Sequence, residues 1–214
     1  VEYFDDDDEL VDRKVIRILR LKQFADIPKD YYVRKTIEEL GTLQLITTAN
    51  QQLFEPRYEV KRKEMVAYLV NLYRLASIEK ESRLAVQSVN TEEQFNEFLI
   101  QKKAHKLVVG YPDGYLKPNA ATTRAEGASF FIRFNEFTGN AVSVNQFVLF
   151  KYIQNDHWVA ETIAKARKAG LIHGSDLHNF NPNQPMKKVE MGLMMARTQF
   201  VREKIEELYD WDNY

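Results

Sequence analysis

The sequence lacks several features that would point to common functional classes. It contains no cysteine, which excludes disulfide frameworks and thiolate metal sites. Its net charge of −1 lacks the basic excess that is typical of nucleic-acid-binding domains. No apolar run approaches the roughly 18 residues that a membrane helix needs. What remains is a chain of 214 residues, 44% hydrophobic and 29% charged, typical of one or two globular domains.

Catalytic signatures are also missing. The sequence has no glycine-rich phosphate loop, nucleophile elbow or metal-binding histidine pair. Its four histidines are scattered (His105, His157, His173 and His178), and the two that are close in sequence have no partner. The acidic run Asp5–Glu9 lacks the spacing of a calcium loop and favours a solvated helix start instead. We therefore expect no catalysis, no metal and no cofactor.

One loop is unusually rich in turn residues. The stretch YPDGYLKPNAATTRAE covers residues 111–126. Its Pro112-Asp113-Gly114 predicts a tight turn, because proline fixes φ and glycine supplies a positive φ. Thr123 and Glu126 have the spacing of a capping box, in which each side chain satisfies a free backbone N–H of a helix start. The loop is therefore predicted to be held against the start of a helix.

This loop recurs twice along the chain at constant spacing. Phe24, Val86 and Phe150 are each followed at one shared distance by a proline and at a second shared distance by a glutamate. The matched positions are Pro56, Pro118 and Pro182; Arg62, Arg124 and Lys188; and Glu64, Glu126 and Glu190. Three ungapped coincidences of this kind indicate a threefold internal repeat.

Each copy predicts the same helix–loop–helix unit. A first helix is expected over roughly 33–44 and 159–169, with Gly170 ending the latter. A second helix is expected to begin near Lys61, Arg124 or Lys188, with its methionines in the core. One such unit cannot bury its own apolar face, so the three copies must pack together.

An additional N-terminal helix is expected from the apolar stripe formed by Val11, Val15, Ile18 and Leu19. The predicted organisation is an N-terminal helical extension (1–23), copy 1 (24–75), a connector (76–85), copy 2 (86–137), a connector (138–149), copy 3 (150–200) and a C-terminal helical tail (201–214).

Together these residues resemble the S-layer homology domain. The resemblance is carried by GYPDGYLKPN and TRAE in copy 2, and by Asp156-His157-Trp158 with Gly170-Leu-Ile-x-Gly174 in copy 3. It extends over about residues 24–200 as three tandem motifs. It implies a mainly all-α fold in which the motifs form a pseudo-threefold bundle.

The resemblance also implies a function and a set of binding residues. Members of this family are non-catalytic anchors that hold envelope proteins onto wall polysaccharide, often pyruvylated, or onto peptidoglycan. Their ligands bind in grooves between motifs. Carried over residue by residue, the ligand-binding positions are Arg124, Arg62, Trp158, Asp26 and Tyr32, with Lys188 at the third arginine position.

The residue types suit such a ligand. An arginine in the first turn of a capped helix adds a bidentate fork to free N–H groups that already attract a carboxylate. An aromatic side chain beside it offers a flat apolar face to a sugar ring. The motifs depart from the family pattern in places: Lys188 replaces an arginine and lacks a threonine cap, and copy 2 has Glu93-Gln94 in place of His-Trp.

Two functions follow from this pattern. The first is a cell-envelope anchor that attaches an exported or S-layer-type protein to wall polysaccharide or peptidoglycan. The alternative is a degenerate scaffold that keeps the bundle and binds another protein within an envelope assembly. Either function predicts a location outside the cytoplasm. Because the chain begins at Val1 without a signal-peptide pattern, an export signal is expected to lie outside it.

Overall fold

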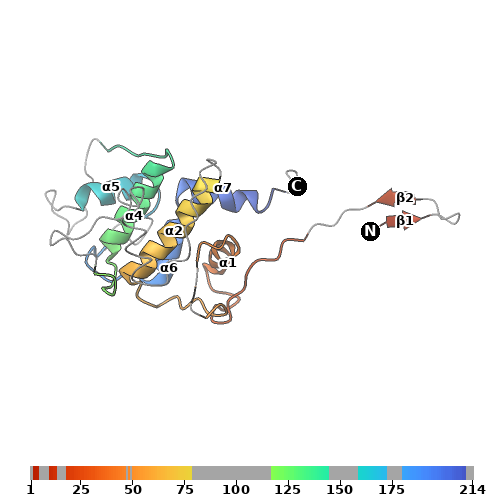
Figure 1. The fold of residues 1–214 in the computed structure, drawn as a ribbon, viewed down its shortest axis with the longest axis horizontal. Helices are drawn as coiled ribbons and strands as arrows, with labels where there is room; N and C mark the ends of the chain where they lie inside the picture. The colour runs from red at the N-terminus through yellow and green to blue at the C-terminus, as the bar shows by residue number, and fades with distance from the viewer. Residues whose placement is uncertain are drawn as a thin grey trace.

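The structure is a computed structural model that describes residues 2–4, 10–13, 18–46, 48, 50–78, 117–144, 159–172 and 180–210. Across these residues the fold is mainly helical, which confirms the predicted class (Figure 1). The helices are α1 (Arg34–Thr42), α2 (Arg62–Ile78), α4 (Arg124–Phe137), α5 (Ala160–Lys168), α6 (Lys188–Ala196) and α7 (Gln199–Glu207). Two short strands, β1 (Glu2–Phe4) and β2 (Leu10–Arg13), precede them.

The predicted N-terminal helix is wrong for the residues that the structure describes. β1 and β2 pair in antiparallel fashion, and residues 18–24 carry no helix. An isolated helix of this length is marginal unless its apolar face packs against something. At Ile18, near the end of the stripe, no such surface covers the side chain, which is 84% exposed. A short apolar run does not by itself distinguish helix from strand, and here the strand pairing prevails.

The first helices of copies 1 and 3 form where the sequence predicts them, as α1 and α5. Two residues after the last helical residue, each is followed by a residue with positive φ, which is Gln44 (57°) in copy 1 and Gly170 (72°) in copy 3. The next residue in each case donates its N–H back into the helix, from Leu45 to the Leu40 carbonyl (3.0 Å) and from Leu171 to the Ala166 carbonyl (2.9 Å). The predicted role of Gly170 is confirmed. The segment of copy 2 in which the repeat predicts a first helix lies outside the described residues.

The second helices α2, α4 and α6 begin within one residue of the predicted starts. At each start the backbone N–H of the cap residue donates to Oε2 of the glutamate three positions later, at 2.8 Å in all three copies. Only in copy 2 is the reciprocal bond present, from the N–H of Glu126 to Oγ1 of Thr123 (3.2 Å). The predicted capping box is therefore confirmed at Thr123.

Three segments that precede these helices join in a closed cycle of backbone hydrogen bonds. The N–H of Val60 donates to the Met186 carbonyl, Met186 donates to Thr122, and Thr122 donates back to Val60, at 3.0, 2.9 and 2.8 Å. One isolated antiparallel bridge lies next to each of these three bonds. These positions are equivalent in the repeat, so the cycle has the threefold permutation that the equal spacing predicts. We call this arrangement the three-segment cycle.

The three repeated prolines occupy equivalent places around the cycle. The carbonyl of each accepts an N–H from the next copy in the cycle, with Lys63 bound to Pro118, Ala125 to Pro182 and Val189 to Pro56 (3.0–3.1 Å). The residue before each proline has a positive φ, namely 60° at Glu55, 48° at Lys117 and 49° at Asn181. The prediction that the prolines share one environment is thus confirmed.

The core lies between the second helices and the helices that cover them. α5 packs against α4, and α1 packs against α6. The core includes Met65, Met191, Met194 and Met195, none more than 3% exposed, which confirms that the methionines are core residues. α7 joins it through Phe200, whose ring meets that of Phe134 edge-on with centroids 5.9 Å apart.

Candidate functional site

The three cations that the sequence marks as ligand-binding occupy equivalent sites at the starts of the second helices. Arg62, Arg124 and Lys188 open α2, α4 and α6. All three residues are buried, at 3%, 4% and 4% exposure. They lie beside the three-segment cycle, where consecutive copies meet. Each side chain therefore contacts protein groups of a neighbouring copy and has little surface exposed to a ligand.

The two arginines form ion pairs between copies. Nη1 of Arg62 lies 3.0 Å from Oε1 of Glu126, and Nη1 of Arg124 donates to Oε1 of Glu190. Arg124 also donates from Nε to the carbonyl of Phe180 (2.8 Å), and its guanidinium lies 5.0 Å from the centre of the Phe180 ring. Each glutamate thus binds its own helix start through Oε2 and the arginine of another copy through Oε1. Sequence analysis missed this role, although the repeated arginine–x–glutamate spacing carries the signal.

The third pair is built differently. Nζ of Lys188 lies 3.7 Å from Oε2 of Glu55, and burial lowers the pKa of this lysine against the opposing effect of Glu55 and Glu64. Oε1 of Glu64 instead accepts a hydrogen bond from the hydroxyl of Tyr58 (3.0 Å). The lysine Nζ lies 5.4 Å from the centre of the Tyr58 ring. The equivalent positions in the other copies are Ala120 and Gln184. The tyrosine is therefore present only in the copy that faces Lys188, where lysine stands in place of arginine.

This tyrosine predicts a pH dependence of stability. Burial first, and then the hydrogen bond and charge of Glu64, raise the pKa of Tyr58 to about 12. The unfolded chain releases that proton near pH 10, so the contribution of the neutral phenol is complete below pH 10 and is lost between pH 10 and about 12. We expect the free energy of unfolding, measured by urea titration across this range, to fall less steeply in Tyr58→Phe than in the parent.

Lys188 and Tyr73 also have shifted pKa values that affect stability in this pH range. The lowered pKa of Lys188 acts in the opposite sense and adds stability as the pH rises toward 10.5, so slopes are compared above that value. Burial also raises the pKa of Tyr73 to about 12, and no carboxylate contributes to that shift. Tyr73→Phe is therefore the matched variant for a buried tyrosine whose pKa is raised without a carboxylate. Identical slopes for Tyr58→Phe and the parent would contradict the assignment.

Asp26 and Tyr32 lie on the lead-in of copy 1 but have different surroundings. Asp26 accepts two backbone hydrogen bonds, from the N–H of Phe54 to Oδ1 (2.7 Å) and from that of Glu55 to Oδ2 (2.6 Å). Tyr32 is 79% exposed, and its ring centroid lies 5.2 Å from that of Tyr31. Burial, and to a smaller extent Tyr32, raises the pKa of Tyr31, and the positive charge of Arg57 acts against this shift. Of these predicted residues, Tyr32 is the one whose side chain is open to a ligand.

The remaining predicted position, Trp158, lies outside the described residues, as do His105, His157, His173 and His178. Among the residues that are described, no three His, Asp or Glu side chains are grouped closely enough to hold a metal ion. No helix in this part of the chain is both long and apolar enough to cross a membrane. Two surface grooves flank residues 20–24, and neither is lined by a residue that the sequence marks for binding.

Comparison with known proteins gives one family match. The S-layer homology domain model matches residues 103–128 and 150–191. These segments contain the TRAE element of copy 2 and most of copy 3, including Arg124, Trp158 and Lys188. Copy 1, which contains Val60 of the cycle as well as Asp26 and Tyr32, lies outside the matched residues.

Individual relatives carry related names. A cellulosome-anchoring protein of Acetivibrio thermocellus is 29% identical over 98 residues, which is 46% of this chain and 22% of the relative. An S-layer protein of Bacillus thuringiensis is 22% identical over 180 residues, covering 83% of this chain and 21% of the relative. An uncharacterized cell wall amidase of Bacillus anthracis is 27% identical over 100 residues, covering 47% and 18%. The matched region is thus about a fifth of the length of these relatives.

Proposed function

Because this chain belongs to the S-layer homology domain family, we propose that it is a non-catalytic module that anchors an exported protein to polysaccharide or peptidoglycan of the cell wall. The names of the S-layer and cellulosome-anchoring relatives support this proposal. So does the repeated architecture, in which three copies close around one cycle. The domain boundaries given above and a location outside the cytoplasm are parts of the same proposal.

The observation that carries the proposal is the exposed Tyr32. It stands at the position in copy 1 that Trp158 holds in copy 3. A large aromatic side chain that is 79% exposed has an unused apolar face, which is the surface a sugar ring packs against. Tyr31 lies beside it, and Arg57 supplies a positive charge nearby. We assign the contact with the wall polymer to this aromatic pair.

The buried cations have a supporting role in this proposal. Arg62 and Arg124 already bind carboxylates of the protein, and their charges are balanced there. Lys188 is surrounded by Glu55, Glu64 and Asp26, which leaves little net positive potential for an anionic ligand. These residues fix the geometry of the cycle, while the exposed side chains of the lead-in meet the polymer.

A binding experiment tests the role of Tyr32. The protein is sedimented with purified wall sacculi of Bacillus licheniformis, the source of a related S-layer protein (29% identical over 109 residues), and the bound fraction is measured as a function of concentration. Tyr32→Ala is expected to weaken binding about tenfold, which corresponds to 1.4 kcal/mol. Tyr32→Phe keeps the ring and is expected to bind nearly as the parent does.

The matched control is Ile18→Ala, because Ile18 is the other large hydrophobic side chain that is strongly exposed (84%) in the described residues. It is expected to bind as the parent does. Equal binding of Tyr32→Ala and the parent would overturn the assignment of Tyr32. If the parent itself fails to sediment with sacculi and instead co-purifies with an envelope protein, the scaffold alternative replaces the anchor.

A further inference from the structure

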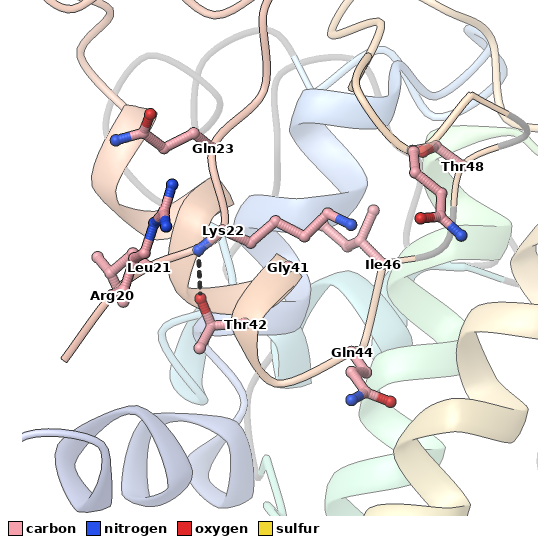
Figure 2. A pocket seen from close by; sticks show the side chains of 10 residues that line it. Arg20, Leu21, Lys22, Gln23, Gly41, Thr42, Gln44, Ile46 and Thr48 are labelled. Atoms are coloured by element: carbon pink, nitrogen blue, oxygen red, sulfur yellow. Dashed lines mark hydrogen bonds between the residues drawn. The ribbon is translucent and has the colours of Figure 1, made fainter.

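A polar groove lies between the end of the N-terminal extension and copy 1, on a part of the surface that contains none of the residues discussed above as ligand-binding. Its volume is about 770 Å³, within the range of roughly 300–1,000 Å³ that is typical of ligand sites. Three stretches of the chain form it: residues 20–23, the end of α1 with the turn that follows, and the loop around Thr48 and Gln51 (Figure 2). We call it the copy 1 groove.

The charge of the groove has one sign. Arg20 and Lys22 line it, and none of the described residues in its lining is an aspartate or glutamate. Figure 2 shows the Lys22 side chain extended across the groove toward Ile46. This is a local positive site on a chain whose net charge is −1. A groove without carboxylates does not suit a hard cation, which prefers oxygen ligands, but it suits an anion.

The other polar side chains of the groove are amides and hydroxyls. Gln23, Gln44 and Gln51 each offer both donors and an acceptor, and Thr48 adds a hydroxyl. Groups that both donate and accept match the hydroxyls of a carbohydrate. In the part of the lining that the structure describes there is no aromatic side chain on which the bases of a single-stranded nucleic acid could stack.

The backbone holds Lys22 firmly in this position. Its N–H donates to Oγ1 of Thr42 at 2.8 Å, and that hydroxyl donates in turn to the carbonyl of Glu38 (2.7 Å). Gly41 permits the close approach, because a Cβ there would lie 2.9 Å from the Phe24 ring and 3.4 Å from Cβ of Lys22. The groove wall is therefore set by packing against α1.

A second groove of about 670 Å³ continues the same surface on the other side of this segment. It shares Lys22, Gln23 and Gln51 with the first and adds Lys29 and Arg34, and the lining residues that are described again include no carboxylate. Arg34 is partly neutralised by Glu38, at 2.7 Å. The positive, amide-rich surface thus extends on both sides of residues 22–23, as expected of a site that follows a chain.

We propose that the copy 1 groove binds a stretch of acidic polysaccharide, with Arg20 and Lys22 meeting its carboxylate or phosphate groups and the glutamines meeting its hydroxyls. The inference rests on the proposed function for the origin of this ligand in the wall. It adds a second contact with the polymer, separate from Tyr32.

Binding of soluble polymers tests the groove directly. The full chain is titrated with polygalacturonate, with poly(glycerol phosphate) and with neutral dextran of similar length. The parent is expected to bind one or both acidic polymers, more weakly at high salt, and not dextran. Binding to polygalacturonate alone identifies a carboxylate source, and binding to poly(glycerol phosphate) alone identifies a phosphate source.

Variants then locate the binding. Arg20→Gln/Lys22→Gln is expected to weaken it at least tenfold, and Gln51→Glu, which adds one negative charge with little change of shape, several-fold. The matched control is Lys63→Gln/Arg74→Gln, which removes the same charge from exposed positions of α2 and is expected to change binding less than twofold. Equal losses in the two double variants, or dextran binding as strong as that of the acidic polymers, would overturn the proposal.

The two proposals fail in different ways. If the parent binds sacculi through Tyr32 but neither acidic polymer, the groove inference is wrong and the anchoring function stands. If the parent binds an acidic polymer through Arg20 and Lys22 but does not bind sacculi, the groove stands and the anchoring function is wrong.

Discussion

Arg124→Met is expected to lower the free energy of unfolding by about 3–5 kcal/mol, the usual cost of removing one partner from a buried ion pair. The substitution leaves Glu190 without its cation and the Phe180 carbonyl without the Nε donor that now binds it. Methionine has roughly the right length to fill the space, so the loss reports the polar contacts more than a cavity. Urea unfolding followed by circular dichroism measures it, and a fall of the melting temperature by roughly 10 °C should accompany it.

Lys188→Met is the matched comparison, and its expected cost is smaller. The nearest carboxylate oxygen lies 3.7 Å from the lysine Nζ, and burial already lowers the pKa of this group, so less favourable interaction is lost. If Arg124→Met unfolds as the parent does but no longer binds wall polymer, Arg124 has the ligand-binding role that the family resemblance predicts.

Asp26→Ala is expected to cost about 3 kcal/mol, because two hydrogen bonds to a charged acceptor are lost together, each worth about 1.5–3 kcal/mol. The carboxylate of Asp26 fixes the backbone N–H groups of Phe54 and Glu55, at 2.7 and 2.6 Å. Those residues lead directly into the turn before Pro56, so the loss should loosen the entry of copy 1 into the three-segment cycle. Thermal and urea unfolding measure the effect.

Two variants control this experiment. Asp26→Asn keeps an acceptor oxygen but no charge, and its cost should lie between those of Asp26→Ala and the parent. Asp30→Ala removes an exposed carboxylate from the same lead-in and should change stability by less than about 0.5 kcal/mol. If Asp26→Ala is as stable as the parent but binds less polymer, Asp26 is a ligand residue rather than a structural one.

The features that could be predicted from the sequence are those encoded locally or by repetition. The end of α5 at Gly170 and the capping box at Thr123 each depend on a few adjacent residues, and both are present. The equal spacing of the prolines was enough to predict that they share one environment. The N-terminal stripe was also a local pattern, but Ile18 shows why it failed: a helix needs a surface to cover, and the sequence does not show whether one exists.

The roles of the buried cations could not be predicted in the same way. Arg124 and Glu190 are 66 positions apart, and their pairing depends on which copy follows which around the cycle. The substitution of lysine at position 188 looked like an eroded binding residue. In the structure it belongs to a rearranged contact in which Tyr58 supplies the hydrogen bond to Glu64. The copy 1 groove was missed because its walls come from residues 20–51, whose relative placement no short motif records.

The closed cycle also bears on how the chain is made. In an open array of repeats each unit rests only on its neighbours, so the structure can grow from one end as synthesis proceeds. Here the N–H of Val60 donates to the carbonyl of Met186, and the N–H of Lys188 donates to the carbonyl of Tyr58. Copy 1 therefore lacks these backbone partners until copy 3 is present. Synthesis must therefore reach copy 3 before any of the three copies has all its backbone partners. Contacts so distant in sequence slow folding, so copies 1 and 2 lack part of their backbone pairing until copy 3 has been made.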